Sequence, residues 1–365
     1  MSLKVAFRVD ASMFIGTGHV MRCLTLATEL RLKGAHCFFI CRELSGNLID
    51  AIKAAGFLVH PIFFESSVSN YLGSNLNPNS FLESQWKEDS DIVLNILGEG
   101  VDWLVVDHYY LDERWEKKVL PGCKNLMVID DLANRPHFCD LLLDQTLGRL
   151  PADYRGLISS KTQLFIGPSY ALIRPIFRSL REQSIKFRKQ KNHVDRLMIS
   201  MGGVDLDNHT LKILEGLRGA PLPSSSDIKV VMGANAPWID SVNRLALNMP
   251  WKTEILVNTP NMAELMAKSD LAIGAAGSTS WERCCLGLPT LICVLADNQR
   301  MVADKLIAAK SAKEFFLGAE LKNNLYSLIE WISGGNNLSI LSGHSLDVCD
   351  GEGVYRITEK IITCY

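Results

Sequence analysis

Residues 4–36 read KVAFRVDASMFIGTGHVMRCLTLATELRLKGAH, and this stretch combines a strand pattern, a glycine-containing turn and a helix pattern. The apolar run at residues 5–9 is typical of a buried strand, and apolar side chains recur at helical spacing over residues 21–33. The letters IGTGH, residues 15–19, lie between the two patterns. A strand that leads through glycines into a helix begins a β-α-β unit, which indicates a parallel sheet covered by helices.

The same alternation continues through the first half of the chain. We therefore expect residues 1–175 to form one doubly wound α/β domain. Residues 64–85, which are rich in Ser and Asn, interrupt the alternation and are expected to form a long surface loop. The further strand patterns lie at 36–41, 58–62, 103–107, 125–129 and 140–143, and the further helix patterns at 47–55 and 113–120.

A second α/β domain is expected over residues 196–345, because at 365 residues two hydrophobic cores are more plausible than one. Residues 176–195 are rich in Lys and Arg and are interpreted as a basic connector with a solvated face; a nucleic-acid-binding arm is the alternative. Residues 346–365 end in an apolar segment that predicts a C-terminal helix. The strand patterns lie at 197–201, 228–232, 253–257, 271–274 and 290–294, and the helix patterns at 208–217, 261–268 and 278–286.

The charge balance argues against large anionic partners. The chain has 38 Lys and Arg against 40 Asp and Glu, a formal net charge of −2, so no global field would attract nucleic acid or an anionic membrane. No apolar run approaches the roughly 20 residues of a membrane span. We expect a monomeric cytoplasmic protein whose partner is a small molecule.

The ten cysteines do not indicate disulfides or a metal site. No C-x-x-C pair occurs, and six cysteines lie in apolar strand or helix patterns, where a free thiol behaves as a small hydrophobic group. A reducing compartment and no metal ion are therefore expected. These six residues are Cys23, Cys37, Cys41, Cys284, Cys285 and Cys293.

Four loops that follow predicted strands are candidate ligand sites, since ligands bind outside the carboxyl ends of parallel strands. They are residues 10–19, 107–110, 200–205 and 274–282. Two such domains joined by a connector are expected to face a central cleft lined by these loops.

The fourth loop indicates a nucleotide site in the second domain. Gly277, Ser278 and Thr279 lie between a strand and a helix, where small residues, hydroxyls and helix N–H groups can bind a diphosphate. Glu282 lies one turn further and could accept hydrogen bonds from ribose hydroxyls; helix capping by Ser278 and Glu282 is the alternative.

The third loop supports the same site. Gly202 and Gly203 follow a predicted strand and allow a tight turn with close backbone approach. Together the third and fourth loops favour binding of a nucleoside diphosphate by the second domain.

The opening loop carries an incomplete nucleotide motif and a histidine, and Gly16 and Gly18 are expected to bring the backbone and a helix end close to the diphosphate of the substrate. Gly16 and Gly18 match the start of the dinucleotide motif G-x-G-x-x-G, but Met21 replaces its third glycine, so a nicotinamide enzyme is only an alternative. His19 follows at the expected start of a helix, where the helix dipole disfavours imidazolium. A neutral imidazole there can act as a general base beside an anionic leaving group.

Seven segments resemble the UDP-2,4-diacetamido-2,4,6-trideoxy-beta-L-altropyranose hydrolases of pseudaminic acid biosynthesis, the PseG family. The resemblance extends to about Gly318, and it implies a glycosyltransferase-B type fold. It also implies hydrolysis of a UDP-sugar by water attack at C1 with inversion, without a metal or other cofactor. The segments are FRVDASMFIGTGHVMRCLTLA, RELSGNLIDAIKAAGF, VVDHYYLDERWE, IDDLANRPHFCDLLLDQT, YRGL, GPSYALIRPIFR and MGGVD.

The resemblance also implies roles for individual residues. His19 matches the general base of the family, Glu282 the glutamate of its uridine site, and Asn298 a substrate contact in an Asn-Gln pair. From their positions at strand ends we further expect Tyr109 to contact the sugar and Asp10 to orient His19 or the water; a turn-capping Asp10 is the alternative. A transferase of the same fold and a UDP-sugar sensor without activity are the other functions considered.

Overall fold

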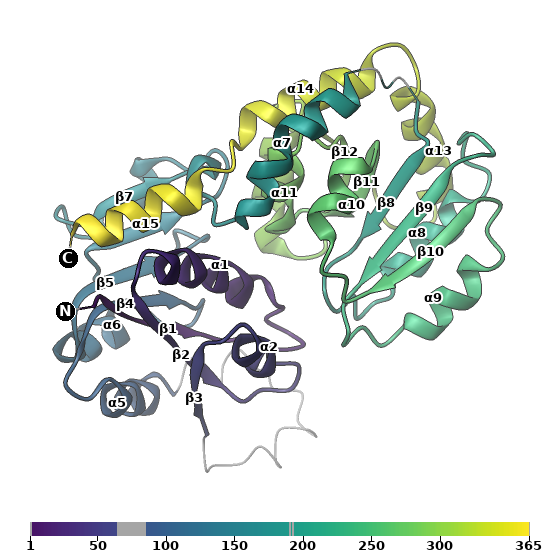
Figure 1. Ribbon diagram of the computed structural model, residues 1–365. Coiled ribbons are helices and arrows are strands. Elements are labelled where there is room, and N and C mark those ends of the chain that lie inside the picture. Colours follow the sequence, from purple (N-terminus) through teal and green to yellow (C-terminus); the bar gives the residue numbers. More distant parts are fainter. Residues whose placement is uncertain (1, 64–84, 190, 192, 365) are drawn as a thin grey trace. The chain divides into compact units, whose positions relative to one another are not determined.

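The computed structural model describes residues 2–63, 85–189, 191 and 193–364, and the chain divides into two compact units (Figure 1). The first unit comprises Met1–Leu172 and Val354–Tyr365, and the second comprises Ile173–Gly353. The expected surface loop at 64–85 lies outside the described residues, except for its last residue.

The first unit contains a parallel sheet of seven described strands in the order β3-β2-β1-β4-β5-β6-β7. The strands are β1 (Lys4–Val9), β2 (His36–Arg42), β3 (Leu58–Ile62), β4 (Val101–Asp107), β5 (Cys123–Ile129), β6 (Leu141–Asp144) and β7 (Gln163–Ile166). Its helices are α1 (Gly18–Leu32), α2 (Ile49–Ala54), α5 (Trp86–Leu97), α6 (Glu113–Val119) and α15 (Gly353–Thr363).

Both faces of this sheet are buried. Along β1, Val5 and Phe7 belong to the core under α1 and α15, whereas Ala6 belongs to the core under α5 and α6. Successive side chains of a strand point to opposite faces, so a strand with two apolar faces has to be covered on both sides. The doubly wound architecture expected for this half is therefore confirmed.

The second unit contains a parallel sheet of six described strands in the order β10-β9-β8-β11-β12-β13. The strands are β8 (Arg196–Ser200), β9 (Asp227–Met232), β10 (Lys252–Val257), β11 (Leu271–Ala275), β12 (Thr290–Cys293) and β13 (Ala312–Glu314). Its helices are α7 (Pro175–Arg188), α8 (His209–Leu217), α9 (Ile239–Ala246), α10 (Met262–Lys268), α11 (Thr279–Cys285), α12 (Arg300–Ala308), α13 (Leu321–Ile332) and α14 (Asn337–Val348).

Helix α7 replaces most of the solvated basic connector expected at 176–195 and belongs to the second unit. Its arginines are not all solvated: Arg188 is buried and Arg181 is partly buried. Each guanidinium donates to several carbonyl oxygens at helix ends, which leaves fewer unsatisfied backbone groups there. The accepting carbonyls belong to Met266, Ser269, Leu286, Cys285, Leu346 and Cys349.

The C-terminal helix α15 packs on the first unit. It begins at Gly353 rather than near the expected residue 346, because residues up to Val348 continue α14. Val354, Ile357 and Ile361 form a helical stripe that is fully buried in the same core cluster as α1. The stretch before and the stretch after the second unit thus build one core.

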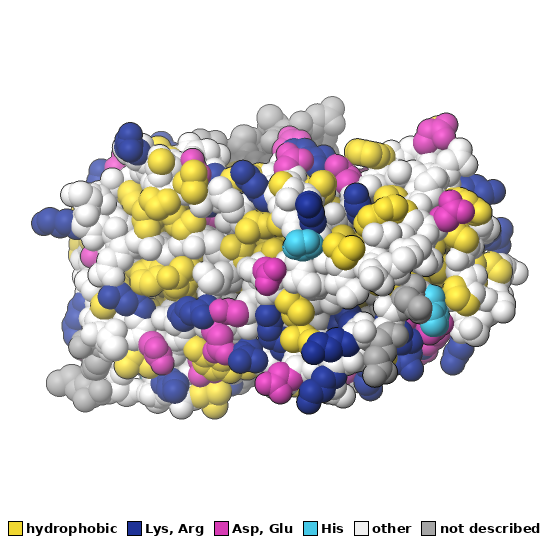
Figure 2. Space-filling view, turned by 90° about the horizontal axis from the view of Figure 1, so that it is seen from above, with side chains coloured by type: hydrophobic (Ala, Val, Ile, Leu, Met, Phe, Trp, Pro, Cys, Tyr) yellow, Lys and Arg dark blue, Asp and Glu magenta, His cyan; other side chains and the backbone are white. Residues whose placement is uncertain are grey.

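The surface agrees with the balanced composition. On the face shown in Figure 2, basic and acidic side chains are interspersed. None of the helices in the described ranges is long and apolar enough to cross a membrane.

Candidate active site

Each unit places two of the four candidate loops side by side. In the first unit β1 pairs with β4, and in the second β8 pairs with β11. At both positions the strand order reverses direction, which is where doubly wound sheets bind ligands. The loops at 10–19 and 107–110 therefore lie together in one unit, and those at 200–205 and 274–282 in the other.

The glycine loop after β1 is a defined turn. The Gly16 N–H donates to the Ser12 carbonyl at 2.9 Å, and the Ser12 hydroxyl accepts from the N–H groups of Phe14 and Ile15. Gly16 has φ +80°, in the left-handed region that a side chain would make unfavourable. Gly18 then begins α1, three residues before the predicted start, and places His19 in the first turn of that helix.

His19 is held by a carboxylate from the neighbouring strand. Its Nδ1 lies 2.6 Å from Oδ1 of Asp107, the last residue of β4. Burial opposes ionisation of Asp107, but the charge of Arg22 and the interaction with His19 outweigh it and hold the pKa of Asp107 well below its ordinary value. An ionised carboxylate can only accept, so Nδ1 carries the hydrogen, and in the neutral form of the ring Nε2 keeps its lone pair.

The other nitrogen of His19 belongs to a side chain that is 7% exposed. No hydrogen bond joins Nε2 to any residue that the structure describes. The Tyr109 ring lies edge-on to the imidazole, with centroids 4.5 Å apart and an interplanar angle of 86°. Tyr109 was predicted to contact the sugar, and the structure places it against the predicted base.

Asp10 does not orient His19, so this part of the prediction is wrong. The Asp10 carboxylate accepts two hydrogen bonds from Arg8, at 2.6 and 3.0 Å, one from the Arg42 N–H at 2.7 Å, and one from His108 Nε2 at 3.2 Å. Its side chain is 0% exposed. Residues two apart on an extended chain share one face, and Asp10 is therefore directed to Arg8 rather than to the helix. These contacts also differ from those of a turn cap.

Asp10 instead supports the segment that carries Tyr109. His108 Nδ1 accepts from the Tyr110 N–H at 3.2 Å, so its Nε2 donates to Asp10. Burial lowers the pKa of His108, although Asp10 opposes this shift. A neutral His108 thus bridges the end of β1 and the turn after β4.

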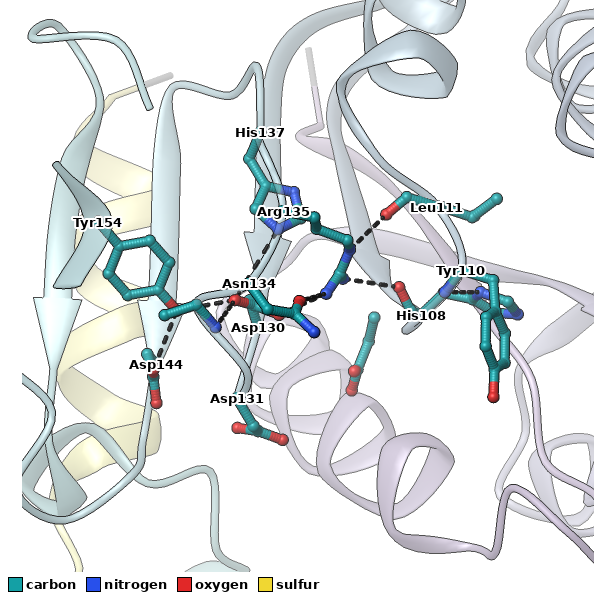
Figure 3. Close-up of polar contacts among 12 residues, drawn as sticks. His108, Tyr110, Leu111, Asp130, Asp131, Asn134, Arg135, His137, Asp144 and Tyr154 are labelled. Atoms are coloured by element: carbon teal, nitrogen blue, oxygen red, sulfur yellow. Dashed lines mark hydrogen bonds and ion pairs between the residues drawn. The ribbon is translucent and has the colours of Figure 1, made fainter. Parts of the chain in front are cut away.

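Asp130, which follows β5, shapes the adjacent turn, as Figure 3 shows. Its carboxylate accepts from the Ala133 N–H at 2.8 Å, from Arg135 at 2.9 Å and from the Tyr154 hydroxyl at 2.9 Å. The same hydroxyl lies 2.9 Å from Asp144, at the end of β6. The ends of β5 and β6 are thereby joined.

Three functional candidates were missed by sequence reasoning: Asp107, Arg22 and Asp131. Asp107 begins one of the four loops singled out, and Arg22 lies three residues after His19, on the same helix face. Arg22 donates to both oxygens of Asp107 and, through Nη1, to Asp131 at 2.7 Å. The H-x-x-R spacing was the available signal for Arg22.

In the second unit the small residues allow close backbone approach. Gly202 has φ +102°, and the Gly203 carbonyl lies so near Gly233 that a Cβ there would collide with it. A Cβ added at Gly277 would meet no described atom within 4 Å. Gly277 thus leaves open space beside the loop that leads into α11.

The capping alternative for Ser278 and Glu282 is not observed. Ser278 precedes α11, which begins at Thr279, but makes no side-chain capping hydrogen bond. Glu282 has a 16% exposed side chain, and its Oε1 lies 3.8 Å from Nη2 of Arg174. Burial raises the pKa of Glu282 to about 7, against the opposing charges of Arg174 and Arg283.

Asn298 is exposed in a short 3-10 helix, Asp297–Gln299, that follows β12. The Gln299 side chain accepts from the Leu295 N–H at 3.0 Å and so holds this turn. Both residues of the predicted Asn-Gln pair thus lie at the carboxyl edge of the second sheet.

Comparisons with known protein sequences identify two relatives that cover most of the chain. No protein-family model matches the chain. The chain is 31% identical over 278 residues, 76% of its length and 86% of the relative, to the UDP-2,4-diacetamido-2,4,6-trideoxy-beta-L-altropyranose hydrolase of Campylobacter jejuni. It is 26% identical over 367 residues, 100% of its length and 67% of the relative, to an uncharacterized protein of Methanocaldococcus jannaschii.

Among solved structures, MurG of Acinetobacter baumannii aligns with a TM-score of 0.68 at 15% identity, over 99% of each chain. At this identity the likeness concerns the fold alone. The fold is of the glycosyltransferase-B type, with two doubly wound α/β units.

Proposed function

We propose that this chain, which belongs to the family of the UDP-2,4-diacetamido-2,4,6-trideoxy-beta-L-altropyranose hydrolases, hydrolyses that UDP-sugar to UDP and the free 2,4-diacetamido-2,4,6-trideoxy-L-altrose. One observation carries the proposal: Nδ1 of His19 is held at 2.6 Å by Asp107, while Nε2 has no partner among the described residues. This arrangement supports a general base that is oriented before substrate binds.

In the proposed reaction the water oxygen attacks C1 of the sugar, and the water proton passes to Nε2 of His19. The bond between C1 and the diphosphate oxygen breaks, and its electron pair leaves with UDP. Attack from the face opposite the leaving group inverts the configuration at C1. Asp107 stabilises the imidazolium that forms, as a buried carboxylate does for other catalytic histidines. No metal or other cofactor is included in this proposal.

We assign UDP binding to the second unit. The backbone of Gly202, Gly203 and Gly277 and the hydroxyls of Ser278 and Thr279 would contact the diphosphate. The Glu282 carboxylate would accept hydrogen bonds from the ribose, and Asn298 would contact the substrate. Their shared position at the carboxyl ends of β8, β11 and β12 supports this assignment.

Glu282→Gln is expected to weaken UDP binding about 10-fold, because a charged acceptor of ribose hydrogen bonds is worth about 1.5 kcal/mol or more. Since burial raises the pKa of Glu282 to about 7, the carboxylate gains its charge as the pH rises through that value. The affinity advantage of the wild type over Glu282→Gln should therefore grow between about pH 6 and pH 8. Isothermal calorimetry gives the Kd for UDP of both proteins at each pH. Ionisation of UDP affects both proteins equally, so it cancels when the two affinities are compared.

The reaction is tested with the UDP-sugar in oxygen-18 water, followed by NMR and mass spectrometry. We expect label at C1 of the sugar and the inverted anomer as first product. Label in UDP would mean attack at phosphorus and would contradict the proposal. Binding without any product would favour a sensor.

A glycosyltransferase is the second candidate, since the fold is of the glycosyltransferase-B type. It predicts no release of free sugar until an acceptor other than water is added. The same NMR time course, run without an acceptor, separates the two candidates.

A further inference from the structure

We propose that Arg22, held by Asp131, is a positioning residue that fixes the Asp107 carboxylate against the ring of His19 and shares the negative charge of that carboxylate. This inference rests on the proposed role of His19 as the base. Arg22 does not itself contact the reacting atoms in this proposal; it acts through Asp107.

All three nitrogens of the Arg22 guanidinium donate hydrogen bonds to carboxylates. Nε lies 2.6 Å from Oδ2 of Asp107, Nη2 lies 2.7 Å from Oδ1, and Nη1 lies 2.7 Å from Oδ2 of Asp131. The side chain is 6% exposed. Only a planar fork with several donors can bind both oxygens of one carboxylate and a second carboxylate at once. The orientation of Asp107, and with it that of His19, is therefore set by Arg22, whose Nη2 also lies 3.2 Å from Nδ1 of His19.

Asp131 is itself held by two neighbouring strand ends. Asp130 closes the turn that follows, through the N–H of Ala133, a non-glycine residue at φ +49°. Arg149 donates to the Asp131 carbonyl at 2.8 Å and to Asp144 at 2.6 Å. Figure 3 shows the Asp131 side chain pointing away from the Asp130 contacts, and its carboxylate binds Arg22 on α1.

The charges around His19 explain why the position of the Arg22 guanidinium matters. The ring faces Asp107 from β4, Arg22 from its own helix and Tyr109 from the segment after β4. Cys23 lies 3.6 Å from Asp107, and Asp131 lies beyond Arg22. An isolated carboxylate would draw a proton onto the imidazole, and a protonated ring cannot accept one from water. Arg22 offsets that attraction while leaving the hydrogen bond intact.

The experiment follows the imidazole of His19 by NMR in protein labelled with nitrogen-15 histidine, with His19→Asn used for assignment. In Arg22→Met the titration midpoint of His19 should move to higher pH by about 1 unit or more, since a neighbouring cation is lost. In Asp131→Asn an anion is lost, and the midpoint should move to lower pH by a smaller amount. In Arg22→Lys the cation is retained, so the titration midpoint of His19 should stay close to that of the wild type.

The matched control is Arg31→Met, an exposed arginine on the same helix, which should leave the midpoint unchanged. An unchanged midpoint in Arg22→Met, or shifts of the same sign in Arg22→Met and Asp131→Asn, would overturn the proposal. If Arg22→Met does not fold, the direction of the shift in Asp131→Asn decides. These spectra need no substrate, so they remain informative even if the proposed hydrolysis fails.

Discussion

His19→Asn is expected to lower kcat for UDP-sugar hydrolysis about 100- to 10,000-fold, the range that a general base contributes. The loss should appear in kcat rather than in the Kd for UDP, because the base acts on the water proton in the transition state. Asn can still donate a hydrogen bond toward Asp107, so the fold should survive. Product formation under saturating substrate and calorimetry with UDP provide the two measurements.

The matched control is His36→Asn, an exposed histidine at the start of β2, which should retain full activity. Near-normal turnover of His19→Asn would mean that the histidine is structural, and the proposed mechanism would fail. A parallel loss of UDP affinity would instead place His19 in ground-state binding.

Asp107→Asn is expected to lower kcat by about 1,000-fold or more, with a different cause. The amide can offer N–H groups to Nδ1 of His19, which favours the tautomer with hydrogen on Nε2 and removes the acceptor for the water proton. The substitution also leaves Arg22 buried with one carboxylate fewer. Breaking a buried ion pair costs about 3 kcal/mol or more, so the melting temperature should fall as well.

Activity per folded molecule separates these two effects, and thermal unfolding measures the second. Asp102→Asn, on the same strand but paired with Lys124, is the control that should keep kcat. Because the folded pKa of Asp107 is depressed, its contribution to stability is fully present above about pH 4 and is lost as the pH falls from the ordinary pKa toward the lower folded pKa. The wild type should therefore lose more stability on acidification than Asp107→Asn.

Most of the strands could be predicted because they are buried on both faces. Residues 101–107, VDWLVVD, are buried throughout, so the apolar run was visible without knowledge of neighbours. The strands that were missed are short and lie at sheet edges: β7 has four partly exposed or exposed residues, and β13 reads AKE. Helix α7 was missed because its arginines bind carbonyl groups, which a charge pattern does not reveal.

His19 could be predicted from the sequence as the candidate base, but its partner Asp107 could not. His19 follows two glycines at a strand-to-helix turn, and this is a local signal. Asp107 is distant in sequence, and its proximity depends on β4 lying next to β1. Asp10 was equally plausible by position, but Arg8 on the same strand face takes its carboxylate. Partner choice is thus set by strand order and side-chain direction, neither of which is local.

Helix α15 has a consequence for how the chain acquires its structure during synthesis. Val354, Ile357 and Ile361 complete the core that begins with Val5 and Phe7, although the whole second unit is translated between them. Translation proceeds from the N-terminus, and domains generally fold as units. The half of the protein that leaves the ribosome first is therefore the last to be finished, and until then the part of its core that α15 covers stays incomplete.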